Sequence, residues 1–196
     1  MPTDDPSGTA LALFPLHTVL VPGATLGLRV FEPRYLDLVR ECGRNGTGFG
    51  VCLILDGNEV GAPARPADVG TQALIEDFGR DKGGLLTLQV RGVRRFRVSR
   101  AWSLASGRQL ADIAWLDDQA PQPLQPQHNL LTVLLQSLLD RFGGEHALAP
   151  SALLDDADWV SWRLAELLPL ANTHRLDLLQ IDDPHQRLDR LLSLLH

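Results

Sequence analysis

The hydrophobic period of this chain changes near its middle, and this change restricts the fold more than any other feature of the sequence. Up to about Leu116, apolar residues recur mostly with a period of two, which is typical of β-strands. Later they recur every three or four residues, as on one face of a helix. Between these parts, "DDQAPQPLQPQ" (117–127) is polar and holds three prolines, which indicates a linker. We therefore expect a β-rich subdomain over 1–120 and a helical bundle over 121–196.

The first part predicts a small barrel or a strongly curved sheet, because many short strands occur there with little helix. The segment "GRDKGG" (79–84) is rich in turn formers and predicts a hairpin between its neighbours. The expected strands are 11–16, 24–31, 48–55, 71–78, 85–90, 95–98 and 109–116.

One helix is expected among the strands, directly after "FEPRY" (31–35). Acid, base and aromatic residues this close suit either an active site or a strand-to-helix corner. Pro33 suits the first turn of a helix and keeps Glu32 extended, near the positive end of the helix dipole. Arg34 could pair with Glu32 or with a neighbouring strand. We interpret the motif as a corner, followed by a buried helical stripe formed by Tyr35, Leu38, Val39 and Cys42.

The second part predicts four helices. "GG" at 143–144 ends the first helix, Asp155 or Asp156 caps the second, and a short helix follows around 173–180. Asp183 and Pro184 begin the last helix. The expected core stripes are Leu131, Leu135, Leu138, Leu139 and Phe142; Val160, Leu164, Leu167 and Leu168; and Leu188, Leu191, Leu192 and Leu195.

Common catalytic motifs are absent from the sequence. Lys82 is the only lysine, and Gly83 and Gly84 follow it, so the chain has no P-loop. A Ser-Lys dyad needs a desolvated lysine, whereas Lys82 falls in a turn. No G-x-S-x-G elbow occurs. We therefore expect no enzymatic activity and assign no catalytic residue.

Cofactor and metal sites are not expected either. The six histidines are scattered, with no HExxH pair, and no CxxC or Cys/His cluster exists. Cys42 and Cys52 lie in apolar surroundings, which favours buried thiols over a disulfide or a reactive pair.

Composition bounds the partners and the compartment. The formal net charge of −6 argues against broad nucleic-acid binding. No apolar run approaches the roughly 20 residues needed to cross a bilayer. The N-terminus is acidic and lacks the order of a signal peptide. We expect a cytoplasmic protein without membrane contact.

The arginine-rich segment "RGVRRFRVSR" (91–100) has two readings. It could form a phosphate or RNA surface on a strand. It could also be the solvent face of an amphipathic strand, with Arg95 and Arg97 outward and Phe96 and Val98 inward. Trp102 is expected at a turn just beyond it, accessible to solvent.

Several segments together resemble the Lon protease N-terminal domain, also called the Lon substrate-binding domain. The opening "LALFPLHTVLVPGATLGLRVFEPRYLDLVREC" carries the most specific likeness. "FGVCLI" and "RGVRRFRV" match later strands, and "LAELLPLANTHRLDLLQIDDPHQRLDRLLSLL" is similar to the helical end. The likeness runs from about Leu11 to Leu195 and implies an α+β fold: a PUA-like β pseudobarrel with one inserted helix, then a C-terminal helical bundle.

The resemblance also implies a function. In full-length Lon this domain helps to recognise unfolded or tagged proteins, whereas the ATPase and peptidase domains have no counterpart in this sequence. We expect a stand-alone, non-catalytic module that binds unfolded polypeptides or peptide segments and acts as an adaptor to a separate protease in protein quality control. The alternative is a nucleic-acid-binding PUA-like protein that uses residues 91–100. Neither reading assigns binding residues.

Overall fold

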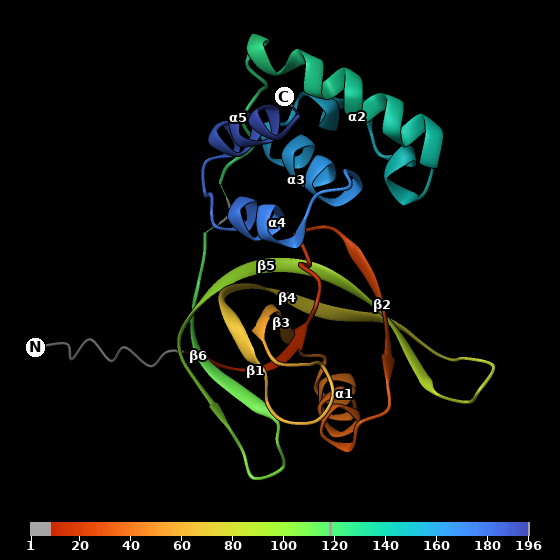
Figure 1. Cartoon of the computed structure of the whole chain (residues 1–196). Coiled ribbons are helices and arrows are strands. Elements are labelled where there is room, and N and C mark those ends of the chain that lie inside the picture. The colour runs from red at the N-terminus through yellow and green to blue at the C-terminus, as the bar shows by residue number, and fades with distance from the viewer. Residues whose placement is uncertain (1–8, 118, 196) are drawn as a thin grey trace, which may run out of the picture. The chain divides into compact units, whose positions relative to one another are not determined.

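The structure is a computed structural model that describes residues 9–117 and 119–195. The chain forms two compact units, Met1–Leu116 and Asp117–His196 (Figure 1). The first is called the β unit below and the second the helical unit. None of the helices in the described residues combines the length and apolar character needed to cross a bilayer.

The β unit is a six-stranded sheet that closes on itself. Its order is β2-β5-β4-β3-β1-β6, and β6 also pairs with β5. Among the strands of the described residues, only β1 and β3 pair in parallel; the other pairs are antiparallel. A barrel-like sheet with one inserted helix was the prediction, and it is confirmed. The strands are β1 (Thr9–Leu16), β2 (Thr25–Val30), β3 (Phe49–Asp56), β4 (Arg65–Arg80), β5 (Leu86–Ser103) and β6 (Gln109–Trp115).

Strand β5 is longer than the sequence suggested and replaces two predicted strands, 85–90 and 95–98. Its first part lies between β2 and β4, and its second part pairs with β6. A register shift between Val98 and Arg100 marks a bulge, which lets one strand bend around the sheet. Trp102 lies within β5, paired with Leu110, so its predicted placement at a turn was wrong.

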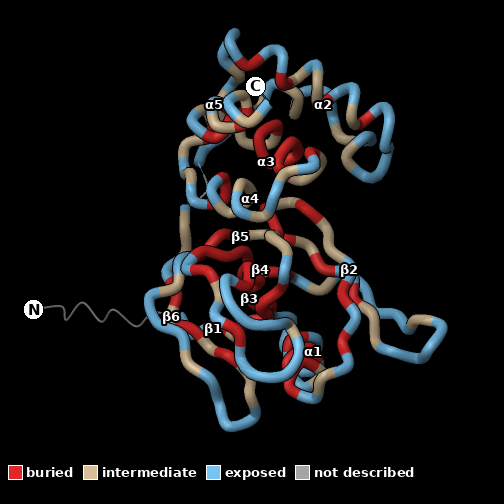
Figure 2. Tube along the Cα trace, in the orientation of Figure 1, coloured by how far each residue is buried: buried red, intermediate tan, exposed pale blue. Residues whose placement is uncertain are grey.

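Phe96 lies at the centre of the β unit core and is fully buried. In Figure 2 the buried residues lie mostly along the strands of the closed sheet and on α1, while much of the connecting loops is exposed. A Cβ atom on Gly50 or Gly70 would come within 2.6 Å of the Phe96 ring, so both strands need glycine at these points. The core cluster consists of Leu11, Leu13, Cys52, Phe96, Ala111 and Ile113, with Val98 and Trp115 packed against it.

Helix α1 (Pro33–Asn45) begins as its sequence predicts. Glu32 is the N-cap residue in extended backbone, and Pro33 is the first helical residue. Gly46 ends the helix with φ 64°, a left-handed conformation that glycine adopts without strain. The predicted stripe of Tyr35, Leu38, Val39 and Cys42 is buried, and both cysteines are free thiols.

The helical unit contains α2 (Asn129–Phe142), α3 (Ala157–Leu167), α4 (Asn172–Leu179) and α5 (Pro184–Leu194). Three 3-10 turns accompany them, at Pro126–His128, Glu145–Leu148 and Ser151–Asp155. The predicted caps are correct, because Asp156 accepts a hydrogen bond at the start of α3 and Asp183 does so at α5.

One prediction for this unit needs correction. Phe142 and Leu195 were assigned to core stripes, yet they are 64% and 46% exposed, because Phe142 is the last residue of α2 and Leu195 follows the end of α5. Part of the expected linker is bonded rather than free. Leu124 donates its N–H to the Asp155 carbonyl, and Ala157 donates to the Gln122 carbonyl. Both bonds lie within the helical unit and attach residues 122–124 to the start of α3.

Arg187 joins α5 to α3 inside the helical unit. Its side chain is fully buried, and the guanidinium lies 3.7 Å from the centre of the Trp162 ring. Nε donates to the Ser161 hydroxyl at 2.8 Å, and Nη2 pairs with Asp158. A buried cation needs such partners, because water cannot solvate it there.

Candidate functional site

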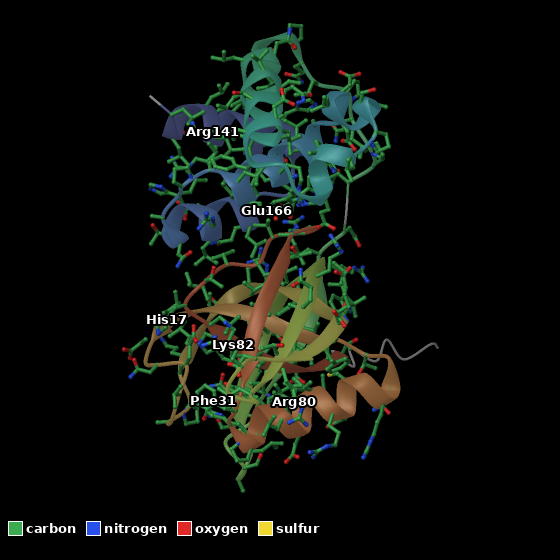
Figure 3. The ribbon with its side chains drawn as sticks, turned by 90° about the vertical axis from the view of Figure 1, so that its right-hand side faces the viewer. His17, Phe31, Arg80, Lys82, Arg141 and Glu166 are labelled. Atoms are coloured by element: carbon green, nitrogen blue, oxygen red, sulfur yellow. The ribbon has the colours of Figure 1, made fainter. Side chains whose placement is uncertain are left out.

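The cysteines do not supply a nucleophile. Burial raises the pKa of Cys52 to about 12 and also raises the pKa of Cys42. A thiol with a raised pKa is almost entirely protonated at neutral pH and reacts slowly, because the thiolate is the nucleophile. Lys82 lies exposed on the turn between β4 and β5, as predicted (Figure 3).

His128 and His185 stack with their ring centres 5.6 Å apart, and two histidines also make local polar contacts. His128 Nε2 lies 2.7 Å from Asp189, and His146 Nε2 lies 2.7 Å from Arg163 Nη1. His17 is exposed near the start of the chain (Figure 3). In the part of the chain that the structure describes, no group of three or more His, Cys, Asp or Glu side chains could hold a metal ion.

The arginine-rich segment is mostly engaged with the protein itself. Arg95 is only 2% exposed, so its predicted place on the solvent face was wrong. The register of β4 against β5 shifts between Thr71 and Ala73, and this irregularity breaks the simple alternation of faces. Arg97 is exposed, as predicted.

Three other arginines of this segment contact side chains of the same unit. Arg91 pairs with Glu76 at 2.5 Å, and Arg100 pairs with Asp112 at 3.1 Å. Arg94 lies over the Trp115 ring at 5.1 Å. Phosphate binding would have to compete with these contacts, so the segment is a poor candidate for a nucleic-acid surface.

A stronger candidate surrounds Arg34, the arginine of the FEPRY motif. This side chain is 8% exposed, and it contacts three separate segments. Nη1 donates to the Gly107 carbonyl at 3.0 Å, between β5 and β6. Nη2 lies 3.1 Å from the Glu32 carboxylate and 3.4 Å from the Glu59 carbonyl, between β3 and β4. Of the two alternatives left open by the sequence, pairing with Glu32 is therefore observed, and the other contacts go to loop carbonyls rather than to a neighbouring strand.

Further contacts fix the same segments. Arg108 pairs with Glu41 of α1 at 2.7 Å. The His17 N–H donates to the Glu59 carboxylate at 2.6 Å. The Arg34 guanidinium also lies 4.7 Å from the centre of the Tyr35 ring, which stacks on Phe14 with ring centres 3.9 Å apart. Contacts with the buried side chains of Arg34 and Tyr35 therefore fix the positions of these loops.

Each of the three segments exposes one large apolar side chain. Phe31 precedes Glu32 and is 50% exposed; Val60 follows Glu59 and is 54% exposed. Leu104 is 39% exposed, and its carbonyl accepts a hydrogen bond from the Gly107 N–H. Figure 3 shows Phe31 at the start of α1. We call Phe31, Val60 and Leu104, together with the segments that carry them, the three-loop surface.

A hollow of about 400 Å³ lies along α1, lined by Asp37, Arg40, Glu41, Arg44 and Asn45, and two further hollows lie elsewhere in the described residues. One, of about 370 Å³, lies over β2, β5 and β4 and includes Gly27, Arg29, Asp77, Gly79, Thr87 and Gln89 among its lining residues. The other, of about 510 Å³, lies on the helical unit beside α2, where Val133 and Leu154 contribute apolar surface. Neither combines buried, convergent polar groups in the manner of a catalytic site.

A closed, mostly antiparallel sheet with one inserted helix, accompanied by a helical unit, defines the class of protein. The model of the ATP-dependent protease La (LON) substrate-binding domain matches residues 10–196. The chain belongs to this family.

Two solved structures resemble this chain. A Lon N-terminal domain protein from Xanthomonas campestris is 51% identical, with a TM-score of 0.80 over 94% of this chain and 98% of that one. The N-terminal domain of the Mycobacterium avium complex Lon protease is 18% identical, with a TM-score of 0.68 over 94% of this chain and 97% of that one. The second likeness concerns the fold alone.

Sequence reasoning missed the three-loop surface. It singled out Arg34, but the partners of Arg34 are mostly main-chain carbonyls, which any residue type can supply. Val60 lies in a glycine-containing loop and Leu104 in a short turn, and neither position has a distinctive pattern. The one available signal was Phe31, a large aromatic residue placed between a strand and a proline.

Proposed function

We propose that this chain is a non-catalytic module that binds unfolded polypeptide segments at the three-loop surface. The observation that carries the proposal is the arrangement around Arg34, which holds three exposed apolar side chains in place from three distant parts of the sequence. Unfolded chains expose apolar side chains that folded proteins bury, so such a surface distinguishes the two. Membership of a substrate-binding family supports this role.

The size of the surface favours weak, general recognition. Complete burial of one large apolar side chain contributes about 1.5–3 kcal/mol. Because Phe31, Val60 and Leu104 are already partly covered, each would contribute roughly 1 kcal/mol on binding. Three such contacts favour exchange among many segments over tight binding of one. That property suits an adaptor that passes unfolded proteins to a separate protease in the cytoplasm, which is the biological role that we propose.

Binding of reduced, carboxymethylated α-lactalbumin, which stays unfolded, tests the proposal. The folded form of the same protein serves as the reference ligand. We expect the purified chain to bind the unfolded form, and a triple variant Phe31→Ser, Val60→Ser, Leu104→Ser to lose most of this affinity. Binding should persist at high salt, because apolar contacts are not screened by ions.

The control variant removes apolar surface from another unit. Leu130→Ser and Leu148→Ser change two highly exposed leucines of the helical unit and should leave affinity unchanged. Equal binding of folded and unfolded α-lactalbumin, or full affinity in the triple variant, would contradict the proposal.

A further inference from the structure

Strand β2 differs from the other strands of the β unit, because in the described residues it is paired on one side only. β1, β3, β4, β5 and β6 each pair with at least two other strands, whereas β2 pairs with β5 alone. The free side of an edge strand presents unpaired backbone N–H and C=O groups, to which another extended segment can bond.

The residues whose backbone faces the free side can be identified. The Gly92 N–H donates to the Ala24 carbonyl, and the Asp81 N–H donates to the Leu85 carbonyl. Backbone direction alternates along a strand, so Leu28, four residues after Ala24, also faces β5. The second bond agrees: Leu85 faces β4, so Leu88, three residues later, faces β2, where it pairs with Leu28. The N–H and C=O groups of Thr25, Gly27 and Arg29 therefore point away from the sheet.

This edge lacks the features that commonly prevent strand addition. The six residues of β2 contain no proline, and their register against β5 runs without a shift. The β3–β4, β4–β5 and β5–β6 pairs all contain shifts. Bulges, prolines and charged residues usually protect sheet edges, and here only Arg29 is charged. Six residues offer about 20 Å of regular edge.

The side chains along this edge specify what a joining strand should carry. No atom lies within 4 Å of the position where a Cβ on Gly27 would stand, which leaves room for a large side chain from the opposite strand. Aromatic residues across from an edge glycine fill such gaps. Arg29 is on the same face, its side chain is 70% exposed, and it reaches Asp81 at 3.4 Å. An acidic residue opposite Arg29 would complement it.

The edge is also continuous with the three-loop surface, because Phe31 directly follows Val30, the last residue of β2. We propose that an extended segment of an unfolded polypeptide joins β2 as an additional antiparallel strand. It carries an aromatic residue opposite Gly27 and an acidic residue opposite Arg29. This inference rests on the proposed function and adds how, and with which sequence preference, the segment is held.

A matched pair of variants at Gly27 tests the backbone contact. Gly27→Pro removes an N–H group from the free edge without removing any hydrogen bond to β5. Gly27→Ala keeps this N–H group and places its Cβ in open space. The probe is the fluorescein-labelled peptide TVDVFVT, compared with a version N-methylated on alternate residues. We expect Gly27→Pro and N-methylation each to weaken binding about fivefold or more, the value of a hydrogen bond, and Gly27→Ala to stay within about twofold.

A charge exchange tests the side-chain preference. Arg29→Glu should weaken binding of TVDVFVT, and the peptide TVKVFVT should recover affinity for this variant alone. Amide hydrogen exchange of the unaltered protein gives a readout that needs no substitution. The Thr25, Gly27 and Arg29 amides should exchange more slowly with peptide bound, while the Leu28 amide should change little.

The outcomes separate this inference from the proposed function. If the chain binds unfolded α-lactalbumin but TVDVFVT does not slow exchange at these three amides, strand addition is wrong and the function stands. If Gly27→Pro is folded by circular dichroism and binds the peptide fully, strand addition is also wrong. If unfolded α-lactalbumin does not bind at all, the proposed function itself fails.

Discussion

Arg34 Nη1 donates a hydrogen bond of 3.0 Å to the carbonyl of Gly107, a residue that follows it by 73 positions in the chain. The bond links the first turn of α1 to the loop between β5 and β6. Because the same guanidinium also reaches Glu32 and Glu59, one buried side chain determines where three loops lie.

Removal of this side chain should destabilise the β unit. Arg34→Ala removes the cationic partner of Glu32 and the donor to the Glu59 and Gly107 carbonyls, and we expect a loss of about 3 kcal/mol in the free energy of unfolding. Urea denaturation followed by circular dichroism measures it. Arg40→Ala, on the same helix, removes an exposed arginine that pairs with Asp37 and should cost less than about 1 kcal/mol. Equal losses in the two variants would contradict the role given to Arg34.

The corner itself should affect stability more than binding. Tyr35→Ala removes the ring that stacks on Phe14, and we expect a loss of about 3–5 kcal/mol. Glu32→Ala should also lower thermal stability, because it removes the acidic partner of Arg34. Tyr35→Phe keeps the stacked ring and serves as the control. Glu32→Ala and Tyr35→Ala variants that remain folded should still bind unfolded α-lactalbumin; full stability with lost binding would show instead that these two residues contact the bound segment.

The buried thiol of Cys52 should make stability depend on alkaline pH. Its pKa is about 12 in the folded protein, against an ordinary value of 9.0, so the unfolded chain releases this proton first as pH rises. The stabilising effect is complete below pH 9 and is lost progressively between pH 9 and about 12. Over that window it contributes a slope of about 1.4 kcal/mol per pH unit.

Urea denaturation at a series of pH values measures this slope. Cys52→Ala lacks the thiol, so its free energy of unfolding should fall less steeply above pH 9 than that of the unaltered protein. Comparing the two slopes cancels other groups, including Tyr35, whose pKa burial also raises. Parallel slopes would show that the thiol titrates alike in both states.

Packing around Phe96 should make Gly50 intolerant of a methyl group. A Cβ at Gly50 would lie 2.6 Å from the Phe96 ring and 2.8 Å from a Leu13 methyl carbon. We expect Gly50→Ala to cost about 1–3 kcal/mol through overpacking. Phe96→Leu in the same chain should recover part of that loss, which a double-mutant cycle measures. A purely additive cycle would show that the ring is not the obstacle.

Local rules predicted the elements that depend on neighbouring residues. Pro33 after an extended Glu32, Asp156 before α3 and Asp183 before Pro184 all signal a helix start through contacts within a few residues. The change of period near Leu116 likewise predicted strands followed by helices. These features need no knowledge of the tertiary arrangement.

Features that depend on distant partners could not be predicted in this way. β5 looked like separate strands because Gly92 and the arginines interrupt its apolar pattern, and only its pairing with β2, β4 and β6 shows that it is continuous. Arg95 is buried because β4 shifts register beside it. The three-loop surface depends on hydrogen bonds to main-chain carbonyl groups, and the amino-acid sequence does not show which carbonyl groups accept them.

The closure of the sheet also has a consequence for synthesis on the ribosome. Thr9 of β1 pairs with Ile113 of β6, so this seam joins residues about 100 positions apart. The ribosome adds about 5–20 residues per second, so β6 is synthesised roughly 5–20 s after β1. During this interval the nascent β unit has an open edge and an incomplete core, and it is itself an unfolded polypeptide that needs protection.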